Sequence, residues 1–254
     1  MCLINFHLRE HPKYKLIIAA NRDEFYERPT ATAHFWEDHS TVLAGRDLLQ
    51  LGTWLGITKE GRIAALTNYR DPSKEKNYAI SRGEVITNYL ISEDTPRDYL
   101  TFINQNRHRY NGFNLIVGNQ NQLYYYNNVE SKISKIPSGT HGLSNHMLNT
   151  SWPKVEKGKQ MLRDYVMNHQ DVEVTKLFEI LSDSEQAQDL YLPQTGIDMD
   201  LERKLSPLFI KTPNYGTRNS TVLLIDNDNF VTFVERTYQN GVFMNDSHFT
   251  FQIN

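Results

Sequence analysis

The stretch YKLIIAANRDEF, from Tyr14 to Phe25, joins an apolar run to a group of polar residues. Its first part, YKLIIAA, has the length and the continuous apolar character of a buried β-strand. Its second part places the tetrad NRDE, residues 21–24, where that strand is expected to end. Such a tetrad is typical of a solvated turn, and it also has the composition of a binding or catalytic site at a strand end. Both interpretations remain open from these residues alone.

The segments around this stretch predict more strands and then helices. LINFHL precedes it and alternates like a strand, while TWLGI and RIAALTN flank the turn sequence TKEGR and predict a hairpin, with Gly61 at positive φ. SRGEVITNYLI has Ser81 and Glu84 at the spacing of a capping box, which indicates a helix start. In TPRDYLTFI we expect Thr95 to cap a second helix and Pro96 to begin it, with an apolar stripe of Tyr99, Phe102 and Ile103.

The rest of the chain, from Phe113 onward, repeats this order of strands and then helices. FNLIVGN and QLYYYNN predict a hairpin, and WPKVEKGKQMLRDYVMNH and VTKLFEILSD predict two helices. DLYLPQTGIDMDLERKLSP is expected to be a long loop that acts as a lid. STVLLID, FVTFVER and HFTFQI then predict three antiparallel strands. Because strands and helices do not alternate one by one, the order favours an α+β fold of two antiparallel sheets with helices on their outer faces. No linker divides the chain, so we predict one domain over residues 1–254.

Composition and charge narrow the class of protein. Hydrophobic residues make up 39% of the 254 residues and charged residues 22%, as in an ordinary soluble globular protein. The net charge of −3 gives no electrostatic reason to expect nucleic acid as a partner. No apolar stretch approaches the ~20 residues of a transmembrane helix. Polar residues such as Asn5 and Arg9 interrupt the N-terminal apolar run, so no signal peptide is expected. These features predict a protein of the cytoplasm without a membrane span.

The chain has a single cysteine, Cys2, so it has neither an intramolecular disulfide nor a cysteine-rich zinc site. Removal of Met1 would leave Cys2 as the first residue, with a thiol and a free amine together. A thiol with a pKa of about 8.5 needs a base, and an α-amine with a pKa of about 7.7–8.0 can take its proton. If Met1 is retained, the amine lies in a peptide bond and this mechanism is lost. The alternative is a buried thiol in the first strand.

Amide and guanidinium side chains recur at other expected strand ends. TNYR contains Asn68 and Arg70, GLSN contains Asn145, and GTRNST contains Arg218. Such groups are neutral donors and fixed cations, which are what recognition of an anion or an oxyanion requires. The alternative is that they cap turns and loops.

Five segments read together resemble one known family. The chain is similar to the NRDE family, also called the transport and Golgi organization 2 family, in MCLINF, NRDEF.ERP, AGRD..QLGTWLGI...GRIAALTNYR, GLSN..L...WPKV and GTRNSTVLL. The resemblance runs in order from Cys2 to about Leu224. It implies an N-terminal nucleophile (Ntn) hydrolase-like fold, a four-layer αββα sandwich. More distantly, the layout is similar to the choloylglycine hydrolase and penicillin acylase branch, where a terminal cysteine attacks an amide.

The resemblance also implies roles for individual residues. Cys2 would be nucleophile and base, Arg22 and Asp23 would orient it, and Arg218 would support it. Asn68 and Asn145 would donate hydrogen bonds to the oxyanion or the substrate.

One feature departs from that branch. Its arginine and aspartate are separated by two residues, as R-N-x-D, whereas here they are adjacent. Asn21 and Glu24 are therefore further candidates for the orienting role, and Asn21 also for contacts with the substrate or the oxyanion.

Two functions remain in competition. The first is a cysteine hydrolase that cleaves a linear C–N amide bond of a small-molecule substrate, such as a fatty-acyl or peptide-like amide, through a thioester. Members of the resembled family have been linked to haem trafficking and lipid metabolism without an agreed reaction. The second function is therefore a non-enzymatic binder or chaperone of haem or an acylated, lipid-like ligand. A homo-oligomer is compatible with either function.

Aromatic and histidine residues bear on the second function. Trp36, Trp54 and the run Tyr124 to Tyr126 are candidates to line a hydrophobic ligand pocket, or else are ordinary core residues. The nine histidines include no HExxH motif, and the chain has no CxxCH motif. Neither a bound metal nor another cofactor is predicted.

Overall fold

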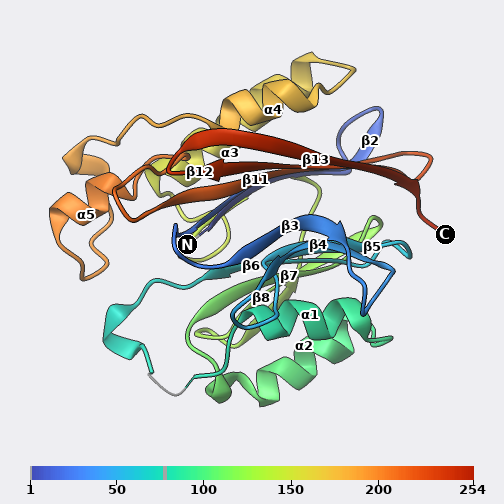
Figure 1. Ribbon diagram of the computed structural model, residues 1–254, viewed down its shortest axis with the longest axis horizontal. Helices are drawn as coiled ribbons and strands as arrows, with labels where there is room; N and C mark the ends of the chain where they lie inside the picture. Colours follow the sequence, from blue (N-terminus) through green and yellow to red (C-terminus); the bar gives the residue numbers. More distant parts are fainter. Residues whose placement is uncertain (1, 77–78) are drawn as a thin grey trace. The chain divides into compact units, whose positions relative to one another are not determined.

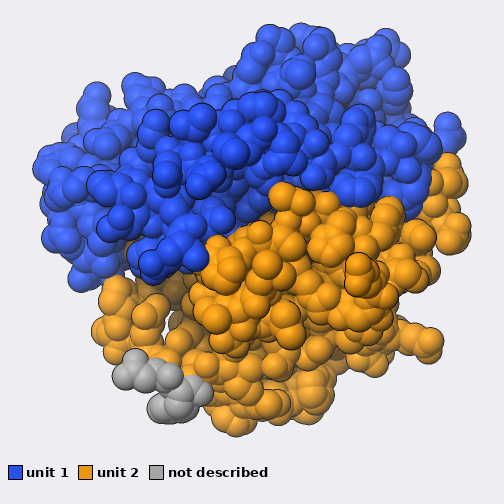
Figure 2. Space-filling view, viewed as in Figure 1, with its two compact units in different colours: residues 1–27, 137–251 blue, residues 28–136, 252–254 orange. Residues whose placement is uncertain are grey.

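The computed structural model describes residues 2–76 and 79–254, and Figure 1 colours them along the chain. The chain divides into two compact units. Unit 1 comprises residues 1–27 and 137–251, and unit 2 comprises residues 28–136 and 252–254 (Figure 2). The two units are described separately below. The prediction of one domain over residues 1–254 stays a prediction.

Unit 1 is built on a six-stranded sheet, counted over the described residues, in the order β10-β1-β2-β11-β12-β13. β1 pairs antiparallel with β2 and β10, and β11 pairs antiparallel with β2 and β12. The strands are β1 (Cys2–Leu8), β2 (Tyr14–Phe25), β10 (Gly139–Leu143), β11 (Tyr215–Asp226), β12 (Phe230–Gln239) and β13 (Val242–Gln252). The two central strands, β2 and β11, are therefore adjacent in the sheet although they come from opposite ends of the chain.

Two helices, α3 (Pro153–Asn168) and α4 (Val174–Leu181), cover one face of this sheet (Figure 1). Their apolar residues pack against those of β1, β2 and β11 in one core, which includes Leu3, Ala19, Val155, Leu162 and Leu177. Because side chains alternate between the two faces of a strand, Leu3 and Ala19 identify the face of β1 and β2 that lies under the helices.

The long polar segment after α4 differs from the predicted loop. It contains a 3₁₀ turn, η3 (Asp189–Tyr191), and a short helix, α5 (Met199–Lys204). The Asp198 side chain caps α5 by accepting a hydrogen bond from the backbone N–H of Leu201. The prediction of a long loop was therefore wrong at residues 199–204, because Asp198 is a helix cap as well as a turn residue. The role of this segment as a lid stays a prediction.

Unit 2 is built on a seven-stranded sheet, again within the described residues, in the order β3-β4-β5-β6-β7-β8-β9. Every neighbouring pair is antiparallel, so the strands follow one another as a meander. The strands are β3 (Thr30–Phe35), β4 (Val42–Asp47), β5 (Leu55–Thr58), β6 (Ile63–Asn68), β7 (Phe113–Asn119), β8 (Gln122–Asn127) and β9 (Lys132–Lys135).

Helices α1 (Gly83–Ile91) and α2 (Pro96–Gln105) connect β6 to β7 and cover one face of this sheet (Figure 1). The connection also contains the 3₁₀ turns η1 (Pro72–Lys74) and η2 (Arg107–Arg109). Trp36 and Tyr126 belong to the core under these helices, and Tyr124 packs against it. The indole N–H of Trp36 donates to the Ala44 carbonyl. Trp36 and Tyr126 are therefore core residues, as the second of the two interpretations expected.

Most local predictions in unit 2 are confirmed. Gly61 has a φ of +80° in the β5–β6 hairpin. The Thr95 side chain caps α2 by accepting from the backbone N–H of Asp98 at 3.2 Å. The apolar stripe of α2 is partly wrong, because Phe102 is exposed and Leu100 is buried in its place.

The predicted capping box at the start of α1 is not formed. Arg82 occupies the N-cap position without a side-chain hydrogen bond to the helix. The Glu84 carboxylate instead accepts a hydrogen bond from the Tyr110 hydroxyl at 3.1 Å. Ser81 and Glu84 have the spacing of a capping box, but the Glu84 side chain is hydrogen-bonded to Tyr110, which is distant in the sequence.

Two antiparallel sheets and their covering helices confirm the α+β fold class. Among the helices of the described residues, none is both long and apolar enough to cross a membrane.

Candidate functional site

The NRDE tetrad lies inside a strand. β2 runs from Tyr14 to Phe25, and Asn21, Arg22 and Asp23 are all buried within it. The solvated-turn interpretation is therefore wrong. The strand continues through these polar residues because β1 pairs with it as far as Arg22 on one side, and β11 pairs with it as far as Phe25 on the other. Buried charges of this kind require hydrogen bonds or opposite charges nearby. The tetrad and the groups that contact it are therefore the candidate site.

The strand register places Cys2 beside this tetrad. Cys2 lies directly opposite Arg22 in the β1–β2 pairing, and Arg22 lies opposite Asn219 in the β2–β11 pairing. Residues directly opposite on paired strands share a face, so the three side chains form a row across β1, β2 and β11. Since Leu3 faces the helices, Cys2 and its row occupy the other face of the sheet.

Cys2 is half-buried as a residue, and its thiol lies among buried groups that perturb its acidity. Burial raises the pKa of Cys2, and the nearby Asp23 carboxylate raises it further. The Arg22 guanidinium and a hydrogen bond from the backbone N–H of Asp23 act in the opposite direction. A thiol with a raised pKa is protonated at neutral pH, so nucleophilic chemistry at Cys2 requires a base.

Asp23 lies at the centre of the buried polar groups. Its Oδ1 accepts a hydrogen bond from the Thr217 hydroxyl at 2.7 Å, and its backbone carbonyl accepts one from the Tyr215 hydroxyl at 2.9 Å. Burial raises the pKa of Asp23, against the positive charges of Lys154 and Arg22 and the hydrogen bond from Thr217. The carboxylate therefore accepts a hydrogen bond from β11 and lies within the electrostatic influence of two buried cations.

We expect Thr217→Val to destabilise the protein more at neutral than at acidic pH. The folded pKa of Asp23 is already above its unfolded value, and loss of the hydroxyl raises it further. Stability linked to such a group is present at low pH and is lost as pH rises through the folded pKa. A lost hydrogen bond to a charged group costs about 1.5–3 kcal/mol, so the loss approaches that size near neutral pH.

Urea unfolding between pH 4.5 and pH 8 measures this difference. Thr237→Val is the matched control, because the Thr237 hydroxyl bonds the neutral side chain of Asn245. Its loss of stability is expected to be independent of pH. An equally pH-independent loss in Thr217→Val would show that its hydroxyl does not stabilise the ionised carboxylate.

Asn145 is connected to Cys2 through its neighbour Ser144. The Ser144 hydroxyl donates to the Cys2 carbonyl at 3.0 Å and lies 3.2 Å from Asn145 Oδ1. Both residues are buried and directly follow β10, the strand beside β1. Sequence reasoning named Asn145 but missed Ser144, although both lie in the GLSN segment.

Asn21 makes structural hydrogen bonds. Its amide group donates to the carbonyls of Leu181 at 2.9 Å and Leu208 at 2.8 Å, and its Oδ1 accepts from the Ser220 hydroxyl at 2.6 Å. Both amide hydrogens are therefore used to join β2 to the end of α4 and to the segment before β11. For this reason we leave Asn21 out of the oxyanion site proposed below.

Arg218 occupies a β-bulge. The β2–β11 register shifts at this residue, and a bulge redirects the side chain that it carries. Arg218 donates to the Phe25 carbonyl at 2.8 Å. Burial lowers the pKa of Arg218, as does the charge of Arg22, whereas Glu24 raises it. Arg218 and Glu24 therefore lie together at the end of β2, near Arg22.

The remaining predicted residue lies in the other unit. Asn68 ends β6 and lies opposite Phe113 of β7. Its contact with substrate stays a prediction.

The predicted removal of Met1 concerns a residue outside the described part of the chain. Over residues 2–76 and 79–254, no group of three or more His, Cys, Asp or Glu side chains is arranged to hold a metal ion.

Two residues near the tetrad were missed by sequence reasoning. The position of Asn219 opposite Arg22 could not be predicted, because the bulge at Arg218 changes which residues of β11 share a face with Arg22. Lys154 is buried in the first turn of α3, where a lysine is ordinarily solvated. The WPKV segment alone contains no signal for that burial.

Comparison with solved structures identifies the fold. A variant of the conjugated bile acid hydrolase from Clostridium perfringens has a TM-score of 0.54 at 10% identity, covering 100% of this chain and 97% of that chain. A Caenorhabditis elegans ortholog of N-acylethanolamine-hydrolyzing acid amidase has a TM-score of 0.51 at 10% identity, covering 88% of this chain and 92% of that chain. The Ntn hydrolase-like fold is therefore confirmed.

Comparison with known sequences identifies the family. The bovine transport and Golgi organization protein 2 homolog is 39% identical and the human one 38%, each covering 93% of both chains. The Drosophila melanogaster protein is 28% identical over 93% of this chain and 92% of its own. The family model described as Transport and Golgi organisation 2 matches residues 1–240. The chain therefore belongs to the transport and Golgi organization 2 family.

Proposed function

We propose that this protein is an N-terminal cysteine hydrolase that cleaves a linear C–N amide bond through a thioester. The observation that carries the proposal is the register that pairs Cys2 with Arg22, next to the buried carboxylate of Asp23. The fold adds support, because two proteins of similar fold are named as hydrolases of conjugated bile acids and of N-acylethanolamines.

The proposed reaction needs Cys2 as the first residue of the mature chain. The α-amine takes the proton of the thiol, and the sulfur attacks the carbonyl carbon of the amide. The protonated amine then gives its proton to the leaving nitrogen, the C–N bond breaks, and an acyl thioester remains on the sulfur. Water, deprotonated by the same amine, adds to the thioester. A carboxylic acid leaves and the thiol is restored.

The neighbouring groups have matching roles in this scheme. Arg22 is a fixed cation opposite Cys2 and favours the thiolate over the thiol. The backbone N–H of Asp23 donates towards the sulfur and, like Arg22, lowers the pKa of the thiol. Asn145, next to the Ser144 that bonds the Cys2 carbonyl, is the proposed donor to the oxyanion. Asn219 shares the face of Arg22 and is a candidate for contact with the substrate.

A cleavable leader tests the proposal directly. The protein is made with an N-terminal leader whose removal by a protease leaves Cys2 as the first residue. An amide probe with an electrophilic warhead is then added to the cleaved and uncleaved proteins, and intact mass reports the adduct. We expect capture at Cys2 in the cleaved protein only, because only this form has the α-amine. Equal capture in both forms, or none in the cleaved form, would contradict the proposed mechanism.

A further inference from the structure

Lys154 is a buried cation in unit 1 that the proposed reaction has not used. Lys154 is the second residue of α3, directly after Pro153, and the exposed fraction of Lys154 is 3%. A lysine is almost never this buried unless its charge is balanced. Its position at the start of α3 therefore requires a specific electrostatic reason.

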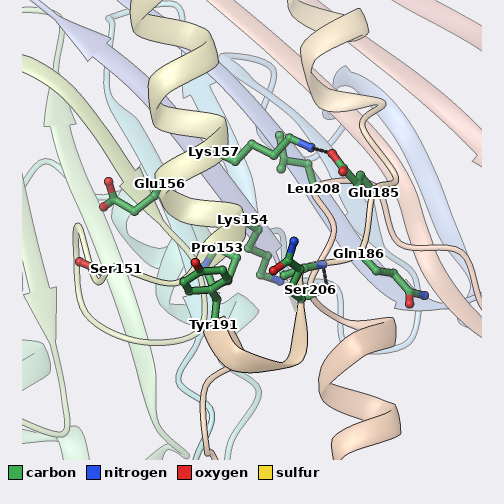
Figure 3. Close-up of a pocket in the computed structure, with 12 residues that line it drawn as sticks. Ser151, Pro153, Lys154, Glu156, Lys157, Glu185, Gln186, Tyr191, Ser206 and Leu208 are labelled. Atoms are coloured by element: carbon green, nitrogen blue, oxygen red, sulfur yellow. Dashed lines mark hydrogen bonds and ion pairs between the residues drawn. The ribbon is translucent and has the colours of Figure 1, made fainter.

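Lys154 lines a pocket of about 420 Å³ in unit 1. In Figure 3, Lys154 and Lys157 extend from successive turns of α3, and Leu208 and Ser206 belong to the opposite wall. The two lysines differ in their surroundings. Lys157 forms ion pairs with Asp183 at 2.7 Å and Glu185 at 2.6 Å and keeps a third of its side chain exposed. Lys154, in contrast, is buried in the first turn of α3.

Contacts already described place Asp23 near this pocket. Asn21 donates to the Leu208 carbonyl at 2.8 Å, and Leu208 lines the pocket together with Lys154. Asp23 is two residues beyond Asn21 in β2, so both side chains lie on the face that α3 covers. The Lys154 charge also lowers the pKa of Asp23 against the effect of burial. Two opposite charges buried at the same place stabilise one another, whereas either one alone is costly.

We propose that Lys154 is a positioning residue of the cysteine site, whose buried ammonium pairs with the Asp23 carboxylate and holds the end of β2 against α3. Asp23 transmits this effect, because its backbone N–H bonds the Cys2 sulfur. A shift at the end of β2 therefore moves the thiol relative to Arg22. The ion pair itself does not depend on the proposed hydrolase function, whereas its effect on Cys2 reactivity rests on that function.

A double-mutant cycle on stability tests the ion pair. Lys154→Met keeps most of the apolar stem and removes the charge, and we expect it to lower the melting temperature at pH 8 by about 10 °C. The loss should shrink towards pH 4.5, because protonation of Asp23 removes the unpaired carboxylate. In the Asp23→Asn background, the same substitution should cost much less and show no pH dependence. Lys157→Met is the matched control from the next turn of α3, and its more exposed ion pairs predict only a small loss.

A loss in Lys154→Met that is independent of pH and equal in both backgrounds would overturn the ion pair. It would show that Lys154 contributes only through the packing of its stem. Lys154→Arg gives a second check, because it keeps the charge. It should retain the pH dependence of the wild type even if the larger guanidinium lowers stability.

Capture of the electrophilic amide probe by Cys2 tests the positioning role. We expect Lys154→Met and Asp23→Asn each to slow capture about tenfold or more, and the double variant to be no slower than Asp23→Asn alone. Lys157→Met should react like the wild type. Normal capture in a folded Lys154→Met protein would overturn the positioning role. If the wild type itself is not captured, the proposed hydrolase function fails, while the stability cycle still decides the ion pair.

Discussion

Cys2→Ala is expected to leave the protein folded and to abolish both amide turnover and covalent capture by the electrophilic probe. Loss of a nucleophile that forms a covalent intermediate lowers kcat by at least about 10³-fold. The fold should survive because Cys2 is the first described residue of β1, is partly exposed, and contributes one small side chain. Circular dichroism checks the fold, and intact mass with product analysis checks the chemistry.

The composition of the chain makes this experiment easy to interpret. Cys2 is the only cysteine, so a thiol-directed adduct on the wild type has one location. Cys2→Ser is the matched variant, because it replaces the thiol with a hydroxyl of similar size that is a much weaker nucleophile. An adduct on Cys2→Ala would contradict the assigned nucleophile. Binding of a small amide or an acylated ligand that is unchanged in Cys2→Ala, with no turnover by the wild type, would support the competing function of a non-enzymatic binder.

Asn21→Ala is expected to cause the largest loss of stability among substitutions in the NRDE tetrad. Its side chain bonds two buried carbonyls and one hydroxyl, which join β2 to the end of α4 and to β11. Each buried group left without its partner costs about 1–3 kcal/mol, so the free energy of unfolding should fall by at least about 3 kcal/mol for the three groups together. Urea denaturation with a global fit of the midpoint and slope measures this change.

Asn219→Ala is the matched comparison for Asn21→Ala. It is also a buried asparagine of the central strands, but its Oδ1 has no hydrogen-bond partner among the described residues. We expect a small change in stability, of about 1 kcal/mol or less, together with slower capture at Cys2. The opposite result, with a stable Asn21→Ala and an unstable Asn219→Ala, would reverse the two roles assigned here.

Local structure was largely predictable from the sequence. Gly61 and Thr95 were correctly assigned because a hairpin turn and a helix cap each depend on a few adjacent residues. Strands β3 and β9 were not predicted, and neither were β4 and β10. The sequences of β4 and β10, VLAGRD and GTHGL, contain glycine and polar residues and lack clear alternation. They form because neighbouring strands offer backbone partners, which no local pattern reveals.

The composition of the candidate site was predictable, but its arrangement was not. Residue types and family resemblance named Cys2, Arg22 and Asp23 together. Whether Cys2 faces Arg22 depends on the register of β1 with β2, and a slip of one residue would send the arginine to the other face. The bulge at Arg218 similarly decides that Asn219 lies opposite Arg22.

The sequence by itself determined the α+β class, the order of most strands and helices, the family, and a single thiol at position 2. These properties follow from the periodicity of apolar residues, from turn residues and from shared motifs, all of which act over short stretches of chain. Only the tertiary structure decided that NRDE continues a buried strand and that Lys154 and Asp23 are buried charges at the same end of unit 1. The burial of these charges depends on β11 and α3, which are far from the tetrad in the sequence. The free energy of this burial therefore comes from long-range pairing, which the local sequence does not encode.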